Sequence, residues 1–162
     1  MVRTRLQKNL IQWVFFDLKS YLDNFLQEPP DNDAQNLSKI ELATAVLMIE
    51  ISLADENIGD SEYKIIKNIL LDQFDLNKMQ IDELISLAED EVDHAVSLHE
   101  FSEIINNELL ATEKINIIEN LWRVAYADAH LHKYEEYYIR KIADLLHVSH
   151  SDFIKTKLKA EK

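Results

Sequence analysis

Two segments of the sequence carry carboxylates at matching positions. In each, an Ala-Asp pair is followed by a Glu seven residues after the Asp, which gives Asp55 with Glu62 and Asp128 with Glu135. Carboxylate oxygens are the ligands that hard cations such as Ca²⁺ and Mg²⁺ prefer. An Asp at the C-terminal end of a helix opposes the helix dipole, so stability alone is a poor reason for it. These four acids are therefore candidate metal ligands, and a divalent cation is the cofactor that the sequence suggests.

The same acids also have a structural explanation. An Asp can accept backbone N–H bonds within its own turn, and a Glu is favourable in the first turn of a helix. An EF-hand loop starting at Asp55 is excluded, because Gly59 stands at loop position five rather than six and Ile66 occupies position twelve, which needs a Glu. The sequence leaves the ligand and the structural explanations open.

Histidines accompany the second acidic turn. His130 and His132 lie close to Glu135 and Glu136, and imidazole with carboxylate can hold Zn²⁺ or another transition metal. The spacing matches no established zinc motif, and HExxH is absent. These histidines are the weaker metal candidates, with surface turn residues as the alternative.

Acidic residues are concentrated in the middle of the chain. The net charge is −13, and eleven carboxylates but only one basic residue, Lys114, lie between Asp82 and Glu119. The densest run is typical of a solvated helix end, but it is unfavourable beside a helix C-terminus and would suit a basic protein partner. Its candidate partner-binding residues are Glu89, Asp90, Glu91 and Asp93.

Composition argues against several classes of function. A single Gly excludes a phosphate-cradling loop, the absence of Cys excludes a thiolate nucleophile or metal site, and no Ser–His–Asp arrangement is evident. The negative charge argues against nucleic-acid binding, which needs clustered Lys and Arg. We therefore expect a non-enzymatic protein without a nucleic-acid partner. The lack of Cys also fits a cytoplasmic location.

The elements that must position the acids are helices. One Gly and two Pro in 162 residues predict long helices with short links, hence an all-α fold: a single-domain bundle of about eight helices. Apolar residues at steps of three and four predict a first amphipathic helix over 3–27, followed by a polar loop over 28–36. The remaining predicted helices span residues 39–55, 61–74, 78–93, 98–110, 112–128, 134–147 and 149–159. Predicted N-caps are Ser38, Asp60 or Ser61, Asn77 and Thr112.

A helix-turn-helix unit is duplicated within the chain. A shift of 73 residues places Ala54-Asp55 on Ala127-Asp128 and Glu62 on Glu135, and apolar positions on both sides also match. The shared Ala-Asp and the Glu seven residues later are more specific than the apolar matches. We interpret the pattern as an ancient duplication that could bring all four acids to one face.

The second unit resembles a known family. Leu121-Trp122-Arg123-Val124-Ala125-Tyr126-Ala127-Asp128, Tyr134-Glu135-Glu136 and Ile139 to Leu146, with Ser149 and Asp152-Phe153, resemble the TerB-like tellurite-resistance domain, in particular its small stand-alone bacterial branch. The resemblance covers residues 38–160 and is most specific over the last forty. The family pattern has Gly after Ala-Asp, whereas this chain has Glu56 and Ala129. If that Gly is left-handed in the family, the turns here must adjust.

The resemblance implies an all-helical fold, a bacterial cytoplasmic setting and no enzymatic activity. It also implies metal sensing or chelation in a stress response, with the acidic positions carried over to Asp55, Glu62, Asp128 and Glu135. A related domain is attached to membrane-anchored J-domain co-chaperones, so a role in protein interaction is equally compatible.

The sequence supports two hypotheses about function and divides the chain into two segments. The first hypothesis is a TerB-like module that binds or senses a metal ion, and the second is a scaffold whose acidic surface contacts a protein partner. We expect an N-terminal amphipathic helix within residues 1–30 and a helical domain over 38–160. Residues 3–27 could also lie on a membrane surface, although their basic residues only marginally outnumber the acidic ones.

Overall fold

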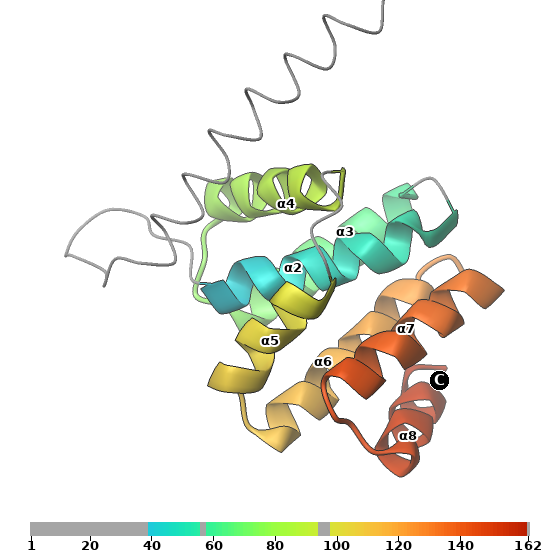
Figure 1. Ribbon diagram of the computed structural model, residues 1–162. Helices are drawn as coiled ribbons and strands as arrows, with labels where there is room; N and C mark the ends of the chain where they lie inside the picture. The colour runs from blue at the N-terminus through green and yellow to red at the C-terminus, as the bar shows by residue number, and fades with distance from the viewer. Residues whose placement is uncertain (1–38, 56–57, 94–97, 162) are drawn as a thin grey trace, which may run out of the picture. The chain divides into compact units, whose positions relative to one another are not determined.

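Helices account for nearly all of the chain that the structure describes. The computed structural model (Figure 1) describes residues 39–55, 58–93 and 98–161, and these contain no β-strand. The elements are α2 (Lys39–Ser52), the 3₁₀ turn η1 (Leu53–Asp55), α3 (Asp60–Gln73), α4 (Lys78–Asp93), α5 (Leu98–Glu108), α6 (Ala111–Ala125), α7 (Lys133–Leu145) and α8 (His150–Ala160). The predicted all-α class is confirmed, and the observed helices lie within a few residues of the predicted ranges.

The α2 helix supplies the most continuous part of the core. Its residues 42–49 are all buried, and the helix itself carries apolar side chains around its whole circumference. A helix of this kind must be covered by neighbours over its whole circumference. Its position therefore fixes η1, which continues directly from its C-terminal end and carries the first acidic turn.

The α6 helix makes the second part of the core and packs against α3, α7 and α8. Trp122 of α6 is completely buried, and its ring centroid lies 5.1 Å from that of Phe153 on α8. Truncating a buried aromatic of this size typically costs about 3–5 kcal/mol. The second acidic turn thus begins from a firmly packed helix.

The helix starts were predicted only in part. The Asn77 cap is confirmed, because Asn77 Oδ1 accepts from the Gln80 N–H at 3.0 Å and Gln80 Oε1 accepts from the Asn77 N–H at 2.9 Å. The predicted caps Asp60 or Ser61 and Thr112 are wrong: the N-cap residues are Gly59 for α3 and Leu110 for α6. In both helices a Glu at the third helical position accepts the N-cap N–H, which sets the cap three residues before that Glu.

Two non-glycine residues adopt left-handed backbone where helices end. His147 follows α7 with φ 58°, and the Val148 N–H donates to the Ala143 carbonyl at 2.9 Å, as in a Schellman ending. Ala129 follows α6 with φ 64°. His147 therefore ends α7 without the glycine that usually occupies this position, and Ala129 lies in the link three residues beyond the α6 C-cap, Tyr126.

The N-terminal predictions fall outside the described residues. The helix over 3–27, the Ser38 cap and the segment 1–30 cannot be compared with the structure. All described residues except Lys39 belong to one unit, Ile40–Lys162. Among the helices that the structure describes, none has the length and apolarity needed to cross a membrane.

Candidate functional site at the paired acidic turns

The two acidic turns lie close together although 73 residues separate them. η1, which ends at Asp55, packs against α7, and α3 packs against α6. Figure 1 shows the start of α3 and the start of α7 at the same end of the helical unit. The duplication therefore places the two matching glutamates near each other.

Glu62 and Glu135 occupy equivalent positions and make equivalent hydrogen bonds. Glu62 Oε2 accepts from the Gly59 N–H at 2.7 Å, and Glu135 Oε2 accepts from the His132 N–H at 2.7 Å. Only 7% of Glu62 and 3% of Glu135 is exposed. Each carboxylate therefore caps its own helix while being largely removed from water.

Electrostatics show that the two glutamates interact. The pKa of Glu135 is raised from 4.5 to about 7, mainly because burial disfavours the charged form. The negative charges of Glu62 and, less strongly, Asp128 raise this pKa further, whereas the hydrogen bond from the His132 backbone and the nearby His132 ring lower it. Near neutral pH, Glu135 is thus a partly protonated acid beside a second buried carboxylate.

The two predicted aspartates are placed differently from the glutamates. Asp128 is exposed, and its Oδ1 accepts from the His130 N–H at 2.9 Å, which is the turn-capping role that the sequence left open. Asp55 is the last residue of η1, but the structure does not describe its side chain. Asp128 is close enough to Glu135 to affect its pKa, so three of the four predicted acids share one electrostatic environment.

The histidines lie on the surface of the second turn. His130 and His132 are both exposed, and His130 Nδ1 lies 3.1 Å from the Asp128 carbonyl oxygen. Glu136 points elsewhere and forms an ion pair with Lys157 of α8 at 2.9 Å. Within the described side chains, no group of three or more His, Asp or Glu is arranged to hold a metal ion.

The predicted partner-binding acids end α4. Asp90 is exposed and Glu89 is partly buried, while the side chains of Glu91 and Asp93 lie outside the description. No basic residue occupies the last turn of α4.

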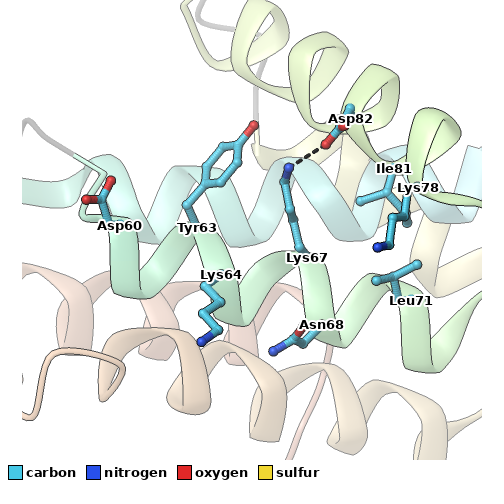
Figure 2. A pocket seen from close by; sticks show the side chains of 9 residues that line it. All are labelled: Asp60, Tyr63, Lys64, Lys67, Asn68, Leu71, Lys78, Ile81 and Asp82. Carbon is cyan, nitrogen blue, oxygen red and sulfur yellow. Dashed lines mark hydrogen bonds and ion pairs between the residues drawn. The ribbon is translucent and has the colours of Figure 1, made fainter.

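Two features of the domain were not predicted. The first is the left-handed backbone of Ala129 (φ 64°), which stands where the family pattern has Gly; Glu56 lies outside the described residues. The second feature is a lysine-lined groove between α3 and α4 (Figure 2). The recurrence of Tyr63, Lys64, Lys67 and Leu71 at steps of three and four, opposite the buried face of α3, could have indicated it.

Comparison with known families identifies the domain. A family model described as tellurite resistance protein TerB matches residues 41–158. The chain belongs to this family. The match includes all of α3 to α7 and both acidic turns, and it confirms the resemblance that the sequence predicted over residues 38–160. Comparisons with curated proteins and with solved structures give no match.

Proposed function

We propose that this TerB domain binds a divalent metal cation at the paired acidic turns. Glu62 and Glu135 are the central ligands, and Asp55 and Asp128 are further ligands from the same two turns. The observation that carries the proposal is the pair of buried, interacting glutamates. Placing two carboxylates near each other away from water is unfavourable unless a proton or a cation compensates their charge.

The Glu135 carboxylate has acceptor capacity for a ligand beyond its backbone hydrogen bond. Each glutamate accepts a backbone N–H through Oε2, and a carboxylate has about four acceptor sites in total. The backbone bonds also hold both side chains in place before a cation arrives. Ca²⁺ and Mg²⁺ take six or more oxygen ligands, so water and the aspartates would complete the coordination.

The chemistry of the donors selects the type of ion. Carboxylate oxygens favour hard cations and repel oxyanions such as tellurite. We therefore attribute a role in tellurite resistance to cation binding rather than to direct capture of tellurite. Because the raised pKa of Glu135 makes protons compete with the cation, binding should strengthen from pH 6 to pH 8.

Calorimetric titration with Ca²⁺, Mg²⁺, Mn²⁺ and Zn²⁺ at pH 6 and pH 8 tests the proposal. We expect saturable binding of at least one cation, with the affinity higher at pH 8. Glu62→Gln with Glu135→Gln should abolish binding and Asp55→Asn with Asp128→Asn should weaken it. Glu103→Gln with Glu113→Gln removes two exposed acids and should leave it unchanged.

Two results would refute the assignment. The first is the absence of saturable binding by all four cations up to millimolar concentration. The second is equal affinity in the wild type and in the variant that lacks both buried glutamates.

A further inference from the structure

A groove of about 380 Å³ lies between α3 and α4 (Figure 2). One wall is the outer face of α3, where Tyr63, Lys64, Lys67 and Leu71 recur at helical spacing. Lys78 and Ile81 of α4 contribute the other wall. Asp60, two residues before Glu62, lines one end of the groove, whereas Glu62, Asp128 and Glu135 do not line it.

The base of the groove is apolar and partly open. Ile81 is 1% exposed and belongs to the core, whereas Leu71 is 37% exposed and is one of the large apolar side chains on the surface. The ring of Tyr63 adds a third apolar surface, and the Lys67 ammonium lies 4.9 Å from its centroid. A single aliphatic side chain from a partner would cover the exposed part of Leu71 and would remove apolar surface from water.

Three lysines (Lys64, Lys67 and Lys78) and two aspartates (Asp60 and Asp82) line the groove, which leaves one net positive charge beside this apolar base in a protein of net charge −13. Lys67 is held by Asp82 of α4, with Nζ and Oδ1 2.5 Å apart. Lys64 and Lys78 are both exposed, and neither forms an ion pair with any residue that the structure describes. These two ammonium groups are available to an anionic partner.

The positions of the lysines indicate an extended ligand. Lys67 reaches toward Asp82 on α4, whereas Lys64 extends from the other side of α3, so the ammonium groups do not converge on one point (Figure 2). The lining face of α3 runs from Asp60 to Leu71, which is about 16 Å along a helix. A single phosphate or carboxylate would contact only one end of this arrangement.

We infer that the groove binds an acidic peptide segment that carries an apolar anchor residue. The anchor lies on Leu71, and carboxylates on either side of it pair with Lys64 and Lys78. Asp82 keeps Lys67 in place at the edge of the anchor site. The ion pairs are exposed to solvent, so the affinity is modest and falls with added salt.

Binding of a defined peptide tests this inference. The probe is a fluorescein-labelled twelve-residue peptide with six Glu and a central Leu pair, and the reference probe replaces every Glu with Gln. Fluorescence anisotropy at 50 mM NaCl should show saturable binding of the acidic peptide only. Lys64→Glu with Lys78→Glu should weaken binding at least tenfold, and Leu71→Ser should weaken it several-fold.

The control reverses the same amount of charge elsewhere. Lys133→Glu with Lys155→Glu alters two exposed lysines on α7 and α8 and should change the affinity less than twofold. Melting curves from circular dichroism verify that every variant is folded.

Any of four outcomes would overturn the inference. Three concern the acidic peptide: no saturable binding, binding no tighter than that of the Gln peptide, or an equal loss of affinity in the control variant. The fourth is displacement of the peptide by low-millimolar phosphate, which would indicate a small-anion site. Sedimentation velocity tests whether a second copy of the chain occupies the groove. Self-association that the groove variant abolishes would assign the groove to a second copy of the chain instead.

Discussion

The N-termini of α6 and α7 begin with the same hydrogen bond in opposite surroundings. Glu113 Oε2 accepts from the Leu110 N–H at 2.7 Å, and Glu135 Oε2 accepts from the His132 N–H at the same distance. Glu113 is exposed to solvent, whereas Glu135 is 3% exposed and lies near Glu62. Helix capping explains Glu113 completely, because an exposed carboxylate at this position has no desolvation cost.

The difference shows that capping does not explain the placement of Glu135. By itself, the backbone hydrogen bond would lower the pKa of Glu135. The pKa is nevertheless raised to about 7, because burial and neighbouring negative charges outweigh that bond. A helix cap without this cost was available, as α6 demonstrates. The buried acids of the two turns therefore need a further reason, which the proposed cation site supplies.

The largest predicted effect concerns stability and pH. Since the pKa of Glu135 is about 7 when folded against 4.5 in the unfolded chain, its protonation contributes stability below pH 4.5 that is lost as the pH rises through 7. Relative to Glu135→Gln, the wild type should lose about 2–3 kcal/mol between pH 5 and pH 8. Urea unfolding in EDTA measures this difference.

The exposed glutamate provides the matched control. Glu113→Gln keeps an acceptor for the Leu110 N–H, so its unfolding free energy should follow that of the wild type within about 0.5 kcal/mol at both pH values. If the unfolding free energies of the wild type and of Glu135→Gln changed equally with pH, the two helix starts would not differ energetically.

A second prediction separates the causes of the raised pKa. Because the charge of Glu62 acts on Glu135 more strongly than that of Asp128, Glu62→Gln should lower the pKa of Glu135 more than Asp128→Asn does. Carbon-detected NMR titration of the Glu135 carboxyl group measures both shifts. The reverse order would mean that the two buried glutamates are not coupled as described.

A third prediction concerns backbone strain before α7. Ala129 has φ 64°, a conformation that costs an L-residue roughly 1 kcal/mol and glycine very little. Ala129→Gly should therefore raise the unfolding free energy by about 0.5–1 kcal/mol. Thermal unfolding at pH 8 tests this, and a loss of stability would show that the entropy of the unfolded glycine chain dominates.

The smallest effect is expected at the start of α3. Gly59 has φ −74°, which alanine adopts freely, but a Cβ there would lie 3.1 Å from Glu62 Oε2. The reduced freedom of the unfolded chain and this close contact act in opposite directions, so Gly59→Ala should change stability by less than about 1 kcal/mol. A larger loss in urea unfolding would mean that the Glu62 carboxylate cannot shift, and would make the first turn the more rigid of the two.

Local sequence signals were enough to predict the helices and the TerB family. Spacing of apolar residues at three and four, the scarcity of Gly and Pro, and the Asn77–Gln80 pair predicted the helix ranges because these signals act within a few residues of the chain. The internal repeat likewise showed that Glu62 and Glu135 are equivalent. The starts of α3 and α6 were misplaced because Gly59 and Leu110 offer no side-chain oxygen and the acceptor lies three residues later.

The burial and the pKa of the turn glutamates depend on tertiary packing. The burial of Glu62 and Glu135, their mutual effect and the contrast with exposed Glu113 depend on the packing of η1 and α3 against α7 and α6, which are far away in sequence. The groove likewise exists only because α4 lies beside α3. Desolvation and Coulomb energy depend on distances in space, so residue spacing along one helix cannot supply them.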